Sequence, residues 1–404
     1  MTEVLSLRPR RQFVLWVLAS YALARVVTTT ILVVVLGHQV PSGMTGGEDV
    51  PVGYFPFTAL WDGQWYQLIA EHGYPSTLPV ADSGKVGENA WAFYPLFPYL
   101  ARAAMGVTGL GFPVVASTIA LLCGFAAAVL MGLLLRGRIG DPAAYLVVAL
   151  WASFPASVTL QLAYTESLAM LLLVGYLYAL SRQRWLVAAV VALLVGLSRP
   201  IAVPLGVVTL VVLVIRWRQR AERPIPTREY AAMAASLLGC GVAGLLWPAI
   251  AWWRTGVSTA YTDTMAAWRG YATVEPFTPW LDKARYFLGD TWGPVWLVVV
   301  PLVLVAMVAG PWASRLGADL RTWSLAYPAY LAVVLDPYTS IFRYLVPLFP
   351  LLVVMLGAGW ADARGNGWRR LLWRAVPLLA LFVVCQYWWT DELWRFVPPS
   401  DFPP

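Results

Sequence analysis

The sequence predicts an all-α membrane protein, a single bundle of about ten or eleven transmembrane helices over residues 1–404. Of its 404 residues, 60% are hydrophobic and only 12% are charged, whereas soluble domains carry about 25% charged residues. The mean hydropathy is +0.67, and long apolar runs recur along the whole chain. One water-soluble core cannot bury this much apolar surface, so the bilayer is expected to cover much of it.

A helix needs about 20 apolar residues to cross the hydrocarbon layer, and runs near that length mark the candidate spans. The first run is too long for a signal peptide and has no cleavage site of small residues, so it is expected to remain as a helix. The break at Ser198-Arg199-Pro200 leaves open whether its two flanking runs form two helices or one kinked helix. The candidate spans are 13–36, 111–135, 142–160, 166–181, 185–198, 200–217, 229–252, 294–312, 320–336, 341–360 and 371–389.

The charges predict an orientation. Most arginines lie in every second connection, beginning with Arg8, Arg10 and Arg11, so the positive-inside rule places the N-terminus in the cytoplasm. The net charge of +7 therefore reflects short loops between apolar runs and does not indicate a nucleic-acid partner. Two outer connections, at about 37–93 and 253–293, are long and rich in Trp, Tyr and Pro. We expect them to form interfacial helices and a site on the extracytoplasmic face.

Asp62 is the strongest candidate for a catalytic group. Spacings of three and four residues place Trp61, Trp65, Leu68 and Ile69 on one stripe of a short interfacial helix that begins near Asp62. An acid held among aromatic residues at the membrane face suits a general base that takes a proton from a sugar hydroxyl. The alternative is that Asp62 only caps the helix.

Four further positions carry unusual chemistry for their surroundings. Tyr94 belongs to an aromatic run, 91–98, that forms either an interfacial belt or a platform that stacks on a sugar ring or guides a lipid chain. Glu166 lies at the outer junction of two apolar spans, where it either favours a helix dipole or has a functional role. Arg199 and Arg343 lie on the same outer side, and their forked guanidinium groups suit a phosphate. The alternatives are snorkelling, or pairing with Asp336 or Glu166.

Other polar residues indicate no cofactor. The three cysteines lie inside apolar runs, and the two histidines, His38 and His72, are too far apart to indicate a metal site. Outer loops lack the Asp-x-Asp pattern that often recruits a divalent ion for a pyrophosphate leaving group, which favours a monophosphate leaving group held by arginines. Scattered carboxylates still leave a divalent metal possible. Arg25, inside the first span, is expected to form a structural pair.

Two segments of the first outer loop resemble those of a known family. Later segments of the chain match the pattern of the same family, in the same order. The two segments are Trp61-Asp62-Gly63-x-Trp65-Tyr66-x-x-Ile69-Ala70-Glu71-x-Gly73-Tyr74 and Ala92-Phe93-Tyr94-Pro95-Leu96-x-Pro98. They resemble the first luminal loop of the second mannosyltransferase of GPI-anchor synthesis and its bacterial relatives. The later segments are Ala163-Tyr164-Thr165-Glu166-Ser167, Ser198-Arg199-Pro200 and Arg343-Tyr344-x-x-Pro347.

The resemblance implies a GT-C-like fold and an inverting glycosyltransferase, most simply a mannosyltransferase, with Asp62 as the catalytic acid of the first outer loop. It implies a polyprenyl-phosphate sugar donor and a lipid, glycan or protein acceptor. A transporter or flippase of a lipid-linked sugar is the main alternative, and a scaffold subunit without chemistry is a third. The residues expected to bind substrate are Trp61, Trp65, Tyr66, Glu71, Tyr94, Glu166, Arg199 and Arg343.

Overall fold

The computed structural model describes residues 10–39, 53–271, 273–360 and 367–395. Within these ranges the regular secondary structure is helical, and the one β pairing is an isolated bridge between Val80 and Val86. Arg8 and the 40–52 part of the first outer loop lie outside the described residues. Six described helices are long and apolar enough to cross a membrane, so this is a multi-pass membrane protein. They are α1 (Arg10–Gly37), α6 (Phe112–Ile139), α10 with η3 (Ala202–Ala221), α11 (Thr227–Thr255), α13 (Thr278–Ala309) and α17 (Trp368–Trp394).

Shorter helices account for most of the remaining predicted spans. Because Pro155 lacks an N–H and starts a new turn, the span predicted at 142–160 divides into α7 and a 3-10 helix. The runs on either side of Arg199 form two separate helices, α9 and α10, which settles the alternative left open by the sequence. The shorter elements are α7 (Asp141–Ala152), η2 (Pro155–Leu160), α8 (Glu166–Ser181), α9 (Trp185–Gly196), α14 (Gly317–Val334), α15 (Ile341–Leu345), η5 (Val346–Leu348) and α16 (Phe349–Met355).

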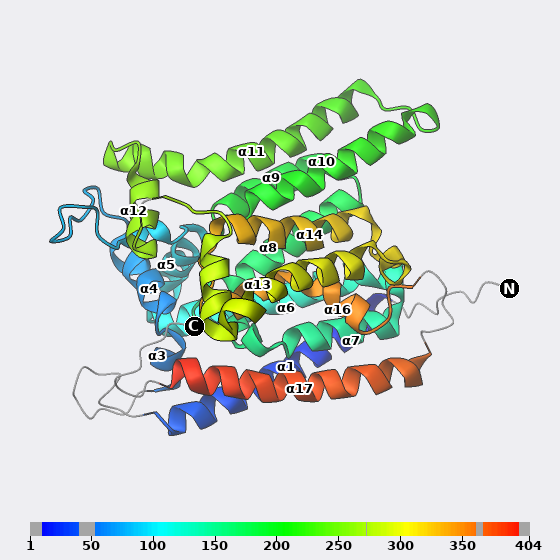
Figure 1. The fold of residues 1–404 in the computed structure, drawn as a ribbon, viewed down its shortest axis with the longest axis horizontal. Coiled ribbons are helices and arrows are strands. Elements are labelled where there is room, and N and C mark those ends of the chain that lie inside the picture. The colour runs from blue at the N-terminus through cyan, green and yellow to red at the C-terminus, as the bar shows by residue number, and fades with distance from the viewer. Residues whose placement is uncertain (1–9, 40–52, 272, 361–366, 396–404) are drawn as a thin grey trace.

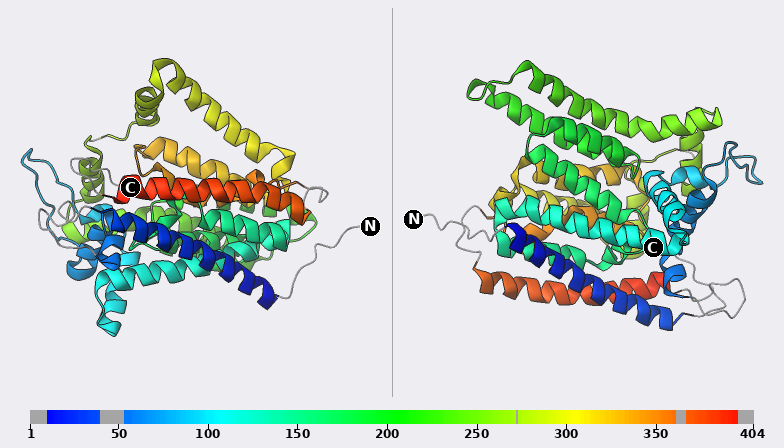
Figure 2. Two further views of the ribbon diagram at one scale, coloured as in Figure 1. Left: turned by 90° about the horizontal axis from the view of Figure 1, so that it is seen from below. Right: turned by 180° about the vertical axis from the view of Figure 1, so that it is seen from behind.

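The second long outer connection is more helical than expected. It contains α12 (Ala260–Arg269), and α13 begins at Thr278, well before the predicted start at 294. Gly289 divides α13 with φ of 80°, a left-handed conformation that glycine adopts without steric cost. Figure 2 shows the second part of α13 standing at the edge of the bundle, where its apolar side chains are mostly exposed and suited to lipid.

Helix α8 lies at the centre of the bundle, packed against α6 and α9 (Figure 1). It is apolar around its whole circumference, as expected for a helix with no solvent-facing side. On the neighbouring pair α9 and α11, a Cβ at Gly196 would overlap the backbone of Ala243, so the close crossing there requires glycine. The buried Arg25 of α1 donates to the carbonyl oxygens of Ala152, the last residue of α7, and Ser157 of η2. This is the structural role expected of Arg25, with backbone carbonyls as its partners.

The segments predicted to lie outside the membrane gather at one end of the bundle (Figure 1). They include α3 (Tyr54–Thr58), α4 (Asp62–His72), α5 (Leu96–Thr108) and α12, while α1 starts at the opposite end. The predicted outer segments and the start of α1 therefore lie at opposite ends of the bundle, as spans that alternate in direction require. The end that carries α3, α4, α5 and α12 is called the loop end below.

Candidate functional site

Asp62 is the first residue of α4, the short helix that the spacing of the aromatic residues predicted. Its neighbour Trp61 occupies the cap position with φ of 56°, a conformation that costs energy for a residue with a side chain and that is concentrated at functional sites. The Trp61 indole donates to the Leu393 carbonyl at 3.2 Å, which ties this turn to α17. The Asp62 side chain is not the helix cap, so the alternative reading of Asp62 as a cap is wrong.

Two hydrogen bonds fasten the turn before α4 to the segment before α8. The Ala163 N–H donates to the Thr58 carbonyl at 3.0 Å. The buried Tyr164 hydroxyl donates to the Leu60 carbonyl at 2.9 Å. Because Glu166 is the first residue of α8, these bonds bring the starts of two helices, and their two carboxylates, to the same place.

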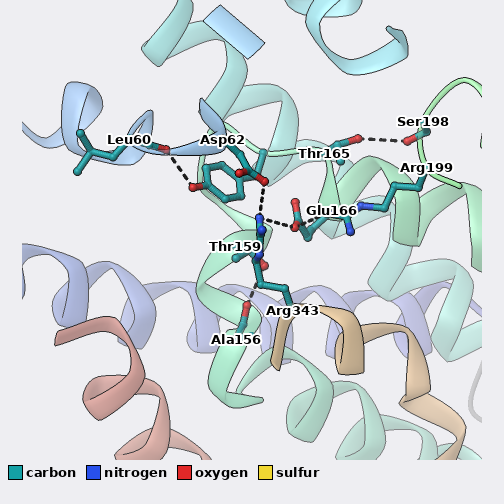
Figure 3. A network of polar contacts seen from close by, with 10 residues as sticks. Leu60, Asp62, Ala156, Thr159, Thr165, Glu166, Ser198, Arg199 and Arg343 are labelled. Atoms are coloured by element: carbon teal, nitrogen blue, oxygen red, sulfur yellow. Dashed lines mark hydrogen bonds and ion pairs between the residues drawn. The ribbon is translucent and has the colours of Figure 1, made fainter. Parts of the chain in front are cut away.

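Two arginines and two carboxylates form a continuous chain of contacts at the loop end (Figure 3). Arg343 Nη1 lies 2.6 Å from Asp62 Oδ2 and 3.4 Å from Glu166 Oε1. Arg199 is bonded to the same oxygen of Glu166. We call Asp62, Glu166, Arg199 and Arg343 the charged cluster; its two formal positive and two formal negative charges balance.

Neighbouring residues fix the two guanidinium groups. Thr165 and Ser198 share a hydrogen bond of 3.2 Å, which holds the α9–α10 turn and hence Arg199 beside α8. Arg199 lies over the Tyr344 ring at 5.6 Å from its centroid, and Arg343 lies over the Tyr164 ring at 5.4 Å. Such contacts favour a cation above an aromatic face, so the aromatic rings help position both arginines.

Asp62 is the most exposed member of the charged cluster, and Arg199 at its other end is 16% exposed. The Asp62 side chain is 26% exposed, whereas those of Arg343 and Glu166 are 7% and 4% exposed. Glu166 Oε2 and Arg343 Nε are buried without a hydrogen-bond partner, which is costly unless a ligand or water satisfies them. Arg199, Glu166 and Arg343 line a cavity of about 20 Å³, which has room for water but not for a sugar ring. Asp62 is therefore the member of the charged cluster that is most accessible to a substrate.

Tyr66 lies one turn after Asp62 on the buried face of α4, against Phe93 and Phe97. Burial raises the pKa of the Tyr66 phenol well above its ordinary value, and the nearby charges of the cluster act on it in both directions. The phenol therefore stays protonated at neutral pH. Tyr66 can offer a hydrogen bond beside the charged cluster but cannot act as a base there.

Other predicted binding residues lie outside the charged cluster. Trp65 stacks on Phe93 at 5.6 Å between ring centroids. Glu71 is at the far end of α4, exposed and bonded to Gln67 at 2.8 Å. Tyr94 is buried and shares a hydrogen bond of 3.0 Å with Tyr261. Substrate contacts by these residues, and by Trp61, stay predictions.

Trp91, at the start of the aromatic run at 91–98, is buried inside the protein. Trp91 is 1% exposed and packs with Trp247 of α11 at 5.0 Å between ring centroids. The Trp91 indole also donates to the Pro75 carbonyl at 3.0 Å. Through these two contacts Trp91 joins the first outer loop to α11, and the loop and the helix together bury its side chain.

Three tyrosines at the cluster were not singled out from the sequence. Tyr164 and Tyr344 stand next to Glu166 and Arg343 within the quoted motifs, but tyrosine is common at membrane interfaces and gave no separate signal. Tyr327 of α14 lines the small cavity and is 2% exposed. No described group of three or more His, Cys, Asp or Glu residues is placed to hold a metal ion.

The sequence matches no family model and no curated protein. Among solved structures, the chain is similar to ArnT from Cupriavidus metallidurans bound to undecaprenyl phosphate, with a TM-score of 0.51 and 15% identity over 93% of this chain and 76% of ArnT. It is also similar to the oligosaccharyltransferase of Archaeoglobus fulgidus in complex with zinc and sulfate, with a TM-score of 0.47 and 12% identity. That match covers 95% of this chain and 54% of the oligosaccharyltransferase, so the chain spans about half of that protein's length.

The similarity to ArnT confirms the predicted fold, an all-α polytopic bundle of the GT-C-like type. At this level of identity it shows the fold alone. The narrower resemblance to the GPI mannosyltransferase family stays a prediction.

Proposed function

We propose that this protein is a membrane glycosyltransferase that moves a sugar from a polyprenyl-phosphate donor to an acceptor on the extracytoplasmic face. The observation that carries the proposal is the charged cluster, in which an accessible carboxylate, Asp62, is joined through Arg343 to a buried carboxylate and a second arginine. The GT-C-like fold supports it. Mannose is the proposed sugar, on the strength of the first-loop resemblance.

In the proposed reaction, the acceptor hydroxyl attacks the anomeric carbon from the face opposite the phosphate, and Asp62 takes the hydroxyl proton. A bond forms between the acceptor oxygen and the anomeric carbon as the bond from that carbon to the phosphate oxygen breaks, so the configuration inverts. The phosphate leaves with the bonding electron pair and gains a negative charge on changing from a diester to a monoester. Arg199 and Arg343 are suited to stabilise that charge where it develops.

The structure offers a place for the lipid tail of the donor. A groove of about 410 Å³ lies between α10 and α11 and is lined almost wholly by small and apolar side chains. Ala202 and Val203, at its α10 edge, follow Arg199 by only three and four residues, so the groove begins close to the charged cluster. A phosphate at Arg199 could therefore be continued by an isoprenoid chain that lies between the two helices. We call this groove the α10–α11 groove.

Filling the α10–α11 groove should weaken use of a long-tailed donor. A Cβ at Gly241 would meet no atom within 4 Å, so Gly241→Phe fits the fold and places a ring in the groove. We expect the KM for a long-chain donor to rise roughly tenfold through lost van der Waals contact, with a smaller change for a donor of two isoprene units. Gly106→Phe, in equally open space on α5, is the matched control. An equal effect of both variants would exclude this groove as the tail site.

The proposed activity is tested with purified protein in detergent. The donors are undecaprenyl-phosphate mannose, glucose and arabinose with radiolabelled sugars, and the acceptors are membranes of a strain that lacks this protein. We expect the label of one donor to appear in an acceptor, with equal release of undecaprenyl phosphate. In liposomes, movement of the labelled donor between leaflets without transfer would instead support the transporter. Neither transfer nor movement with any donor would reject both functions.

A further inference from the structure

A second polar region lies at the end of the bundle opposite the charged cluster. Three adjoining hollows of about 370, 240 and 530 Å³ share lining residues: the first two share Arg138 and Ser181, and the last two share Tyr178 and Arg182. We call this continuous region the basic groove. Its arginines are Arg10, Arg138, Arg182, Arg184, Arg216 and Arg315.

Among the described residues that line the basic groove there are six arginines and only one carboxylate, that of Asp319. Asp319 forms an ion pair with Arg138 at 2.6 Å, and Arg216 forms one with Glu229 at 2.8 Å. These two ion pairs fix the walls of the groove. Arg182 and Arg184 are exposed at its rim, so the field of the groove is strongly positive where it opens.

The rim is rigid. Arg182 and Arg184 flank Gln183, which adopts φ of 55° in the tight turn between α8 and α9. The Gln183 and Arg184 N–H groups donate to the Leu180 and Ala179 carbonyls, each at 2.9 Å. The two arginines are therefore displayed from a fixed backbone, which reduces the entropy lost when they bind a ligand.

The position of the basic groove indicates what it binds. Helix α10 has 17 residues and is therefore about 25 Å long, close to the thickness of the hydrocarbon layer. Arg199 precedes its first turn, and Arg216 is in its last turn. The basic groove thus lies near the opposite membrane interface. Its apolar wall includes Val212 and the partly exposed Ile215, beside which an acyl chain can lie.

We propose that the basic groove binds the phosphate headgroup of an anionic glycerophospholipid from the leaflet opposite the charged cluster. Arg182 and Arg184 contact the phosphate at the rim, and the acyl chains pass along α10. Basic pockets between transmembrane helices at an interface have the charge and depth that such headgroups require. This site is separate from the proposed transfer reaction and does not depend on it.

Native mass spectrometry of the purified full chain tests this proposal with phosphatidylglycerol, phosphatidylcholine of matched acyl chains, and inorganic phosphate. We expect wild-type protein to retain phosphatidylglycerol over phosphatidylcholine. Arg182→Gln with Arg184→Gln should weaken phosphatidylglycerol binding by roughly 30-fold, or about fivefold for each charge near the headgroup. Arg218→Gln with Arg220→Gln, an exposed pair at the same end but outside the groove, is the matched control.

Several results would overturn the proposal. They are equal retention of the two lipids by wild-type protein, unchanged binding by the Arg182 and Arg184 double variant, or an equal loss in the control. Competition by inorganic phosphate at the same concentration as the lipid would also contradict it, because the site would then bind free phosphate. The comparison of the two lipids on wild-type protein holds even if a variant fails to fold. Lipid retention is measured without sugar transfer, so its result is independent of the proposed function.

Discussion

Asp62→Asn is expected to lower the turnover of sugar transfer by roughly 10²–10⁴-fold, the usual contribution of a positioned general base. The amide keeps the size of the side chain and its place at the start of α4, but it cannot accept the acceptor's proton. Donor binding should stay within a few-fold of wild type, because Arg199 and Arg343 remain. Single-turnover rates and donor affinity, measured on the same preparation, separate the two effects.

The loss of the Asp62–Arg343 ion pair needs its own control, since Asn cannot balance the charge of Arg343. Asp62→Glu restores a carboxylate with a longer side chain and should recover part of the turnover. Asp82→Asn makes the same change at an exposed position of the same outer loop and should have no effect. Transfer at the wild-type rate by Asp62→Asn would remove Asp62 from the reaction.

The helices could be predicted from the sequence because each apolar run carries its own signal. The short helix α4 was found from a pattern of its own, the spacings of three and four residues between Trp61 and Ile69. The early start of α13 was missed because its first turns carry Asp282, Lys283 and Arg285, and a segment with three charges does not form a continuous apolar run. The break of α13 at Gly289 could not be predicted either, because a single glycine within an apolar run is only weak evidence for a break.

The members of the charged cluster were predictable individually, since each is a charge beside apolar runs. Their pairing was only partly predictable. The sequence suggested Glu166 as a partner of an arginine, and the structure pairs it with Arg199 and Arg343. The contact between Asp62 and Arg343 spans 281 residues and depends on how α4, α8 and α15 meet. Local sequence patterns contain no information about a contact between residues so far apart. Asp336, the other partner considered for the arginines, instead accepts a hydrogen bond of 3.4 Å from the Tyr271 hydroxyl.

Arg199→Ala is expected to weaken donor binding by roughly tenfold or more, the size expected when a hydrogen bond to a charged group is lost. The turnover of bound donor should change less, because Arg343 stays beside Asp62. Donor affinity is measured directly, with undecaprenyl phosphate as a competitor. Arg254→Ala, an exposed arginine at the loop end of α11, is the matched control and should bind donor normally.

A second variant separates phosphate binding from mere neutralisation of Glu166. Removing Arg199 leaves the buried carboxylate with Arg343 alone, at 3.4 Å, and the excess negative charge would itself repel a phosphate. Adding Glu166→Gln to Arg199→Ala removes that charge. If Arg199 contacts the phosphate, donor binding stays weak in the double variant, because the missing guanidinium is not replaced. If Arg199 only neutralises Glu166, the double variant binds donor as wild type does, and the phosphate contact is excluded.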